Sequence, residues 1–236
     1  MKNEKINLVA FDADDTLWAH ENIFQEAQVK FKTSLEKYSS NEITMDKLHE
    51  YERKNLQYFG YGVKGFMLSM IETAIELTSG RIPGNEIQQI IDLGRWMLNH
   101  PVHILDNVEF TLNQLRKNGY TLIIITKGDL FDQETKIARS GLAENFDAIE
   151  IVSEKKPEIY QSIFTKYDFD PSETVMVGNS LKSDILPVLA IGGHAIHIPF
   201  HVTWVLEQVE DHQLEGHEYH QLSDISMVPD FLETLT

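Results

Sequence analysis

The stretch INLVAFDADDTLW, residues 6–18, joins an apolar run to three closely spaced carboxylates. The apolar residues 8–11 are typical of a buried β-strand. Asp12, Asp14 and Asp15 follow at its carboxyl end, which is where open α/β sheets bind their ligands. Carboxylates this close together repel one another and would take up protons unless a cation lay among them. The stretch therefore predicts a hard-cation site, with Mg²⁺ as the best match to oxygen ligands, and the alternative is an acidic turn that caps a helix.

The composition limits the partners that this protein can have. Its 236 residues include 20 Lys and Arg against 37 Asp and Glu, which gives a formal charge of −17. A surface this acidic repels nucleic acid and anionic lipid, so we expect no nucleic-acid partner and no membrane partner. A phosphorylated ligand would need a locally positive site, which a metal ion and a few lysines must supply.

Cysteine usage and hydropathy indicate the compartment. The sequence contains no cysteine, which excludes disulfides and thiolate chemistry. No stretch approaches the roughly 18 uninterrupted apolar residues of a transmembrane helix, and the first residues lack the apolar core of a signal peptide. We therefore expect a cytoplasmic protein.

The hydrophobic pattern changes at about residue 106. Residues 21–98 carry apolar side chains at helical spacing in three stripes, separated by Ser-, Gly- and Pro-containing breaks. Later in the chain, helical segments alternate with short apolar runs at residues 120–125, 148–152, 174–177, 194–198 and 219–222. Such alternation predicts a parallel sheet with right-handed crossovers. We therefore predict an α/β fold with a Rossmann-like, doubly wound core of residues 1–18 and 100–236, and an all-helical domain inserted at residues 19–99.

Polar residues follow several of these runs, where a parallel sheet would bring them beside Asp12. Thr126 ends the second strand, and its hydroxyl with nearby backbone N–H groups could hold a phosphate oxygen. Lys156 precedes a proline at the first turn of a helix, and its ammonium could neutralise a carboxylate and a phosphoryl oxygen. Asp184, six residues after Gly178, could lie beside the cation. Singly, these residues are also explained as a turn, a solvated charge and a helix N-terminal acid.

Together, the order D-x-D-x-T-L, T after a strand, K-P and G-N-x-x-x-x-D resembles that of the haloacid dehalogenase (HAD) superfamily of phosphohydrolases. The resemblance covers the α/β core, and its first motif, residues 12–17, is highly specific. It implies that Asp12 is the nucleophile and forms an aspartyl-phosphate, and that Asp14 is the general acid/base. It implies phosphate binding by Thr126, Lys127 and Lys156, and a Mg²⁺ site formed by Asp12, the Asp14 backbone carbonyl, Asn179 and Asp184.

The helical insert matches the cap domain that this superfamily places between its first and second motifs. Such caps close over the site and exclude water during the reaction. The insert contains the segment YFGYGVKG, residues 58–65, in which Tyr61 and Lys64 are candidate substrate contacts. The alternative is that the segment is a flexible turn between two helices.

Two positions depart from the superfamily pattern. Asn179 stands where the superfamily usually has Asp, so one charge at the metal is missing. Lys127 stands where Asn is common, and it adds positive charge near the phosphate.

The leading hypothesis is a Mg²⁺-dependent phosphatase that acts on a small-molecule phosphate ester. A hydrolytic 2-haloacid dehalogenase of the same superfamily is the nearest alternative, but that chemistry needs neither Mg²⁺ nor an acid at the position of Asp14. A phosphosugar mutase and a non-catalytic binding module with the same fold are further alternatives. The sequence makes no prediction of the individual substrate or of the oligomeric state.

Histidines are concentrated near the end of the chain. Six of the ten lie between His194 and His220, which raises the possibility of a zinc site. Their spacing does not place two ligands on one convincing helix with a third nearby. We therefore expect surface or core histidines here.

Overall fold

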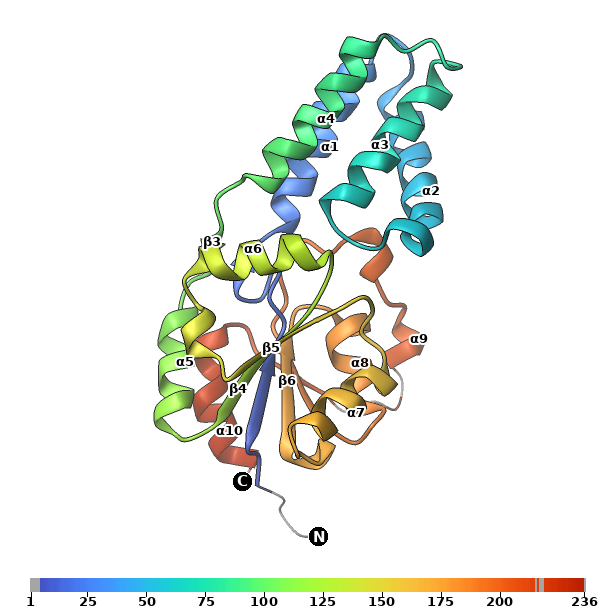
Figure 1. The fold of residues 1–236 in the computed structure, drawn as a ribbon. Coiled ribbons are helices and arrows are strands. Elements are labelled where there is room, and N and C mark those ends of the chain that lie inside the picture. Colours follow the sequence, from blue (N-terminus) through green and yellow to red (C-terminus); the bar gives the residue numbers. More distant parts are fainter. Residues whose placement is uncertain (1–4, 215, 217–218, 236) are drawn as a thin grey trace. The chain divides into compact units, whose positions relative to one another are not determined.

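The computed structural model describes residues 5–214, 216 and 219–235, and the chain divides into two compact units. Met1–Ala19 and Val102–Thr236 form an α/β unit, and His20–Pro101 form a helical unit (Figure 1). The helical unit is inserted between the first and second strands of the main sheet of the α/β unit, and each unit has its own hydrophobic core.

The α/β unit contains a six-stranded parallel sheet with the order β5-β4-β1-β6-β7-β8. Its strands are β1 (Leu8–Phe11), β4 (Thr121–Lys127), β5 (Ala148–Val152), β6 (Thr174–Gly178), β7 (His194–His197) and β8 (His220–Gln221). The chain runs from β1 to β4 and β5 on one side, then to β6, β7 and β8 on the other. The strand order therefore switches at β1, and a ligand crevice is expected beyond its carboxyl end. The predicted α/β class with a parallel, Rossmann-like sheet is confirmed.

Both faces of the sheet are covered, which explains the unbroken apolar character of β1. Val9 and Phe11 face a core formed with helices α5 (Val108–Lys117), α6 (Leu130–Ser140) and α10 (Val228–Leu235). Leu8 and Ala10 face a core formed with α7 (Pro157–Lys166) and α8 (Leu186–Leu189). Figure 1 shows α5 and α10 on one side of the sheet and α7 and α8 on the other. Because alternate side chains of a strand point to opposite faces, every residue of β1 has to be apolar.

Short elements complete the α/β unit. Strands β2 (Trp18–Ala19) and β3 (His103–Ile104) pair antiparallel where the chain leaves and re-enters this unit. The remaining turns are the 3₁₀ segments η1 (Ala143–Asn145), η2 (Pro171–Glu173), η4 (Val205–Glu207) and η5 (Ile225–Met227), the π-helical segment η3 (Leu181–Ile185) and the short helix α9 (Asp211–Leu214).

The helical unit consists of α1 (Glu21–Leu35), α2 (Asn41–Phe59), α3 (Val63–Leu77) and α4 (Gly84–Leu98). The apolar stripes seen in the sequence form its core, in which Phe31, Leu48 and Met70 are almost completely buried. Helices α3 and α4 approach closely at Gly94, where a Cβ atom would lie 2.6 Å from the Met67 sulfur. The glycine therefore sets the packing distance between these two helices.

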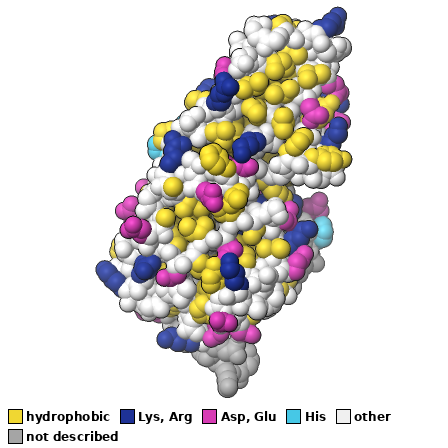
Figure 2. Space-filling model, in the orientation of Figure 1, with side chains coloured by type: hydrophobic (Ala, Val, Ile, Leu, Met, Phe, Trp, Pro, Cys, Tyr) yellow, Lys and Arg dark blue, Asp and Glu magenta, His cyan; other side chains and the backbone are white. Residues whose placement is uncertain are grey.

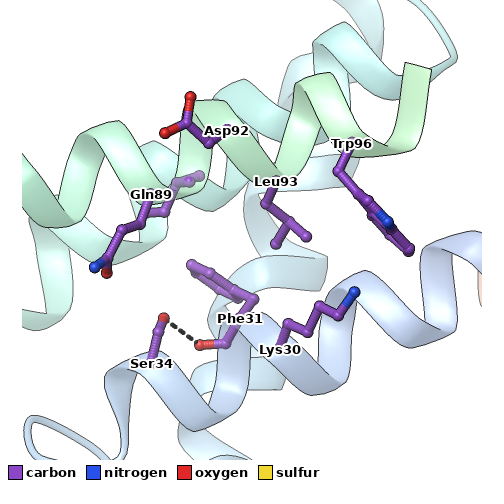
Figure 3. Close-up of a pocket in the computed structure, with 8 residues that line it drawn as sticks. Lys30, Phe31, Ser34, Gln89, Asp92, Leu93 and Trp96 are labelled. Atoms are coloured by element: carbon purple, nitrogen blue, oxygen red, sulfur yellow. Dashed lines mark hydrogen bonds between the residues drawn. The ribbon is translucent and has the colours of Figure 1, made fainter. Parts of the chain in front are cut away.

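A groove of about 330 Å³ lies between α1 and α4 of this unit (Figure 3). Lys30 extends over the Trp96 ring, with its Nζ 3.6 Å from the ring centre, and the Ser34 hydroxyl donates to the carbonyl of Phe31 on its own helix. In a ligand-binding site, a few polar groups converge on one point. The charged groups here have partners that do not line the groove, since Lys30 pairs with Glu26 at 2.7 Å and Asp92 pairs with Arg95 at 2.9 Å. We therefore assign the groove no ligand.

The surface mixes charges of both signs. On the face shown in Figure 2, Lys and Arg side chains are interspersed with Asp and Glu among exposed hydrophobic ones. Within the described part of the chain, no helix combines the length and the apolar character needed to cross a membrane.

Glu52 is a carboxyl group buried within the helical unit. Its residue surface is only 6% exposed, and its Oε2 atom has no hydrogen-bond partner among the described residues. Burial raises the pKa of Glu52 to about 7, although Arg53 opposes the shift. The folded protein therefore keeps this proton at pH values where the unfolded chain has lost it. Stability is unaffected below the ordinary pKa near 4.5, falls as the pH rises toward 7, and stays reduced above that value.

Replacing Glu52 by glutamine removes this titration with little change in size. We expect Glu52→Gln to raise the free energy of unfolding by about 2 kcal/mol near pH 8, with a much smaller gain near pH 5, as measured by urea denaturation. Glu50→Gln, at an exposed position of the same helix, is the control and should show no such pH dependence. An equal gain at both pH values in Glu52→Gln would contradict a titrating buried carboxyl.

Candidate functional site

The site begins at Asp12, the first residue after β1. Its backbone N–H donates to the carbonyl of Val177 at 2.9 Å, which ties it to the end of β6, and the residue is only 7% exposed. The chain then reverses tightly, with the Asp15 N–H donating to the Trp18 carbonyl at 2.7 Å. Asp15 has a left-handed backbone (φ 60°), a conformation that Asp tolerates better than most residues. This reversal keeps Asp14 close to Asp12.

Lys155 connects two carboxylates in the centre of the site. Its Nζ lies 2.5 Å from Oδ1 of Asp12 and 2.6 Å from Oδ1 of Asp184, and all three side chains are buried. Lys155 lies in the loop between β5 and α7, and Asp184 lies in η3, which follows β6. Segments far apart in the sequence thus converge on Asp12.

The prediction that Lys156 occupies this position is wrong. Lys156 is exposed and forms the N-cap of α7, and its neighbour Lys155 has the buried side chain. The backbone at Lys156 is extended (φ −125°, ψ 160°), and successive side chains of an extended chain point in opposite directions. Only one of two adjacent lysines can therefore face the site, and the K-P pattern alone does not show which.

The charge cluster of Asp12, Lys155 and Asp184 contains two carboxylates and a single ammonium. Burial raises the pKa of Asp12 to about 7; Lys155 opposes this shift and Asp184 adds to it. Burial acts to lower the pKa of Lys155, but Asp12 and Asp184 outweigh it and hold the pKa well above its ordinary value. Lys155 is therefore a permanent cation, and two carboxylates share its single charge. A second cation here would relieve the remaining repulsion.

Asp184 depends on a glycine for its position. A Cβ atom on Gly178 would lie 2.3 Å from Oδ2 of Asp184, so a side chain at 178 is incompatible with this placement. The same Oδ2 accepts a hydrogen bond from the backbone N–H of Ser180 at 2.9 Å. The end of β6 therefore fixes the carboxylate with one oxygen against the backbone and the other against Lys155.

The oxygen atoms of the site suit a hard divalent cation. The Thr16 hydroxyl lies 3.4 Å from Oδ2 of Asp12 and 3.4 Å from Oδ1 of Asn179, which brings the amide oxygen to the same region as the carboxylate. In the described part of the chain, no three Asp, Glu or His side chains form a metal-ligand group. A cation would be held by two carboxylates supplemented by amide and backbone oxygens, which is a donor set suited to Mg²⁺.

Asp14 has a separate set of partners. The Trp18 indole donates to its Oδ1 at 2.7 Å, and the Gln133 amide donates to its Oδ2 at 3.0 Å. The Lys136 ammonium lies 2.8 Å from one carboxylate oxygen and 2.7 Å from the other. Sequence reasoning missed all three partners. The only signal for Gln133 and Lys136 was their three-residue spacing on a helix that follows Thr126.

Thr126 and Lys127 lie at the end of β4, but their surroundings differ. Thr126 is buried, and its hydroxyl accepts a hydrogen bond from Gln133 at 2.6 Å. The Lys127 ammonium lies 2.7 Å from Glu207 and 3.0 Å from the Ser183 hydroxyl. Burial acts to raise the pKa of Glu207, but Lys127 and the serine hydroxyls outweigh it and lower the pKa. The Lys127 charge is thus compensated by Glu207, and its contact with a phosphate group stays a prediction.

Tyr61 and Lys64 belong to the helical unit. Tyr61 lies in the turn between α2 and α3 and is half-buried, and Lys64 is exposed in the first turn of α3. Their contact with a substrate stays a prediction.

The histidines near the end of the chain form no metal-ligand group among the described residues. His197 is buried, with its ring nitrogens 3.2 Å from the Gln221 side chain and 3.0 Å from the Asn179 carbonyl. His217 lies outside the described residues.

Comparisons with known proteins agree on one family. The sequence model of the haloacid dehalogenase-like hydrolases matches residues 6–192. The crystal structure of a haloacid dehalogenase-like family hydrolase from Xanthomonas campestris is 41% identical, with a TM-score of 0.87 over 100% of this chain and 94% of that chain.

Two curated relatives are phosphatases. A glyceraldehyde 3-phosphate phosphatase of Methanothermobacter thermautotrophicus is 30% identical over 53% of this chain, and the match spans 57% of that relative's length. An N-acylneuraminate-9-phosphatase of Mus musculus is 26% identical over 77% of each chain. The chain therefore matches little more than half of the first of these relatives.

The two adjacent lysines provide a direct test of the charge cluster. We expect Lys155→Met to lower the free energy of unfolding by about 3 kcal/mol at neutral pH, because it leaves two buried carboxylates without a counter-charge. Lys156→Met removes the same charge from an exposed position and should change stability by less than about 0.5 kcal/mol. Guanidinium denaturation of both variants in magnesium-free buffer makes the comparison. Similar small effects at the two positions would contradict the buried ion pair.

Proposed function

The chain belongs to the haloacid dehalogenase-like hydrolases, and we propose that it is a Mg²⁺-dependent phosphatase that cleaves a small phosphorylated metabolite. The observation that carries the proposal is the buried contact of Asp12 and Asp184 with Lys155 at the switch point of the sheet. The phosphatase activity of the curated relatives supports the choice of substrate class.

In the first step, a carboxylate oxygen of Asp12 attacks phosphorus in line with the leaving alcohol. A new O–P bond forms to Asp12 while the bond from phosphorus to the ester oxygen breaks. The departing oxygen takes a proton from Asp14, which acts as general acid. The product of this step is an aspartyl-phosphate and a free alcohol.

In the second step, water replaces the alcohol. Asp14, now a carboxylate, takes a proton from the water as its oxygen attacks phosphorus. The bond between phosphorus and Asp12 breaks, which releases inorganic phosphate and restores the nucleophile. Atoms and protons balance over the two steps, and the net reaction is hydrolysis of a phosphate monoester.

Other residues of the site bind the phosphoryl group and offset its charge. Lys155 lies against the nucleophile, and its ammonium reduces the repulsion between Asp12 and an anionic ester. The hydroxyl of Thr126, at the end of β4, would donate a hydrogen bond to a phosphoryl oxygen. This assignment replaces Lys156 with Lys155 as the phosphate-binding lysine.

Mg²⁺ would be held by Asp12, the backbone carbonyl of Asp14, Asn179 and Asp184. When bound, it supplies positive charge that stabilises the transferring phosphoryl group. The shared single charge of Lys155 and the all-oxygen donor set support this choice of ion.

Asp14 favours phosphate chemistry over dehalogenation. A dehalogenase attacks carbon and releases halide, which needs no proton donor at this position. Here three side chains hold the Asp14 carboxylate. These donors stabilise the carboxylate form of Asp14, which is the state that takes a proton from water in the second step.

A panel of small phosphate esters tests the proposal. We expect wild-type protein with Mg²⁺ to release inorganic phosphate from some members, and we expect a chelator or Asp12→Asn to reduce release to the uncatalysed background. Lys155→Met should lose about 10²–10³-fold in rate, whereas Lys156→Met should retain the wild-type rate. Halide release from 2-haloacids without Mg²⁺ would favour the dehalogenase, and phosphate transfer to a sugar hydroxyl would favour the mutase. Activity that survives in Asp12→Asn would remove the proposed nucleophile.

Asn179 tests the placement of the ion. We expect Asn179→Asp to tighten Mg²⁺ binding roughly tenfold in isothermal calorimetry without substrate, because it adds a carboxylate to the donor set. Asn41→Asp adds the same charge at an exposed position of α2 and should leave the affinity unchanged. Unchanged affinity in Asn179→Asp would place the ion away from residue 179.

A further inference from the structure

Three side chains contact the Asp14 carboxylate, and two of them come from α6. Lys136 contacts both carboxylate oxygens at 2.8 and 2.7 Å, and Gln133 donates to Oδ2 at 3.0 Å. Trp18 donates to Oδ1 from the chain reversal after β1. With donors on both oxygens, the carboxylate has little freedom to rotate.

The start of α6 is fixed by local interactions. The helix begins after Gly128, and the side chain of Asp129 caps it by accepting the N–H of Asp132 at 3.0 Å. Gly128 has φ +156°, and a Cβ atom there would lie only 3.1 Å from the Gln133 side chain. Residues three apart share one face of a helix, so this fixed start directs both Gln133 and Lys136 toward Asp14.

Gln133 also connects Asp14 to the phosphate-binding side of the site. Its Nε2 lies 2.6 Å from the Thr126 hydroxyl as well as 3.0 Å from Asp14. Its Oε1 is buried and has no hydrogen-bond partner among the described residues. A buried amide oxygen in this state is an acceptor for a donor that binds here, such as a water molecule or the hydroxyl of the leaving alcohol.

The Lys136 ammonium lies near two carboxylates. Its side chain is 11% exposed, and besides Asp14 it approaches Asp132 at 3.8 Å. The distance to Asp14 is about 1 Å shorter, so Asp14 is the closer of these two carboxylates.

We propose that Lys136 and Gln133 are positioning residues that hold the Asp14 carboxyl group in place for proton transfer to the leaving oxygen. The inference rests on the proposed phosphatase function and adds residues that act through Asp14. Proton transfer requires the acid to lie within hydrogen-bonding reach of the ester oxygen. Loss of the donors on α6 releases the carboxylate from that geometry, and the cost depends on how much the leaving group needs a proton.

Leaving-group dependence provides the test. An alkyl phosphate releases a strongly basic alkoxide and needs the acid, whereas p-nitrophenyl phosphate releases a stable anion and needs it little. We expect Lys136→Met to lower kcat/KM about 10²-fold for the best alkyl phosphate of the panel and less than about fivefold for p-nitrophenyl phosphate. Asp14→Asn should show the same selectivity. Because kcat/KM covers steps up to aspartyl-phosphate formation, a defect in the later hydrolysis step does not contribute.

Two matched variants separate positioning from a general structural effect. Arg139→Met removes a charge from an exposed position one turn further along α6, and it should affect neither ester. Lys136→Arg keeps the charge and should recover most of the alkyl-ester rate. Equal losses for both esters in Lys136→Met, or equal damage in Lys136→Arg and Lys136→Met, would overturn the inference.

The outcomes distinguish this inference from the proposed function. If wild-type protein hydrolyses neither ester, the phosphatase proposal fails. If wild type is active and Asp14→Asn is selective while Lys136→Met behaves like Arg139→Met, the positioning inference alone fails. If Lys136→Met does not fold, Gln133→Met provides the same test. We expect it to show a smaller loss in kcat/KM that is confined to the alkyl ester. Equal losses for both esters in Gln133→Met would contradict the inference.

Discussion

The contact of one ammonium with two buried carboxylates is the constraint on which the site depends. Burying Asp12 and Asp184 together is unfavourable, and Lys155 compensates only half of their charge. Burial raises the pKa of Asp12 to about 7, and repulsion from Asp184 adds to this shift while Lys155 opposes it. A folded protein retains such an arrangement only when the surrounding backbone holds it in place. Here the ends of β1 and β6 and the loop after β5 provide that support, and the buried sheet provides the stability.

The two carboxylates of the D-x-D motif are separated by their surroundings. Asp12 lies with Lys155 and Asp184, and Asp14 lies with Trp18, Gln133 and Lys136. Each carboxylate thus has its own lysine. Pairs of titratable groups in contrasting environments are a common basis for dividing catalytic roles. The division fits a nucleophile at the first position and an acid/base at the second, and Gln133 connects the acid/base to Thr126.

Much of the architecture was predictable from local pattern. The apolar run of residues 8–11 indicated a strand covered on both faces, and the alternation after residue 106 indicated a parallel sheet. Asp12, Asp14, Thr126 and Asp184 were identified because they follow strands, and parallel strands bring their carboxyl ends to one edge. The choice between Lys155 and Lys156 failed, because the direction of a side chain in a short loop depends on where the next helix begins.

The sequence by itself determined the fold class and the acidic D-x-D motif at the end of the first strand, because periodicity and the order of strand ends are local properties of the chain. Tertiary structure decided which lysine faces Asp12, that Glu207 compensates Lys127, and that α6 holds Asp14. The partners lie far apart in the chain: Lys127 and Glu207 by 80 positions, Asp14 and Lys136 by 122, and Asp12 and Lys155 by 143. No pattern within a single segment records which distant partner a charged side chain meets. The partner is determined when the strands assemble into the sheet, because each charge that becomes buried then needs an opposite charge beside it.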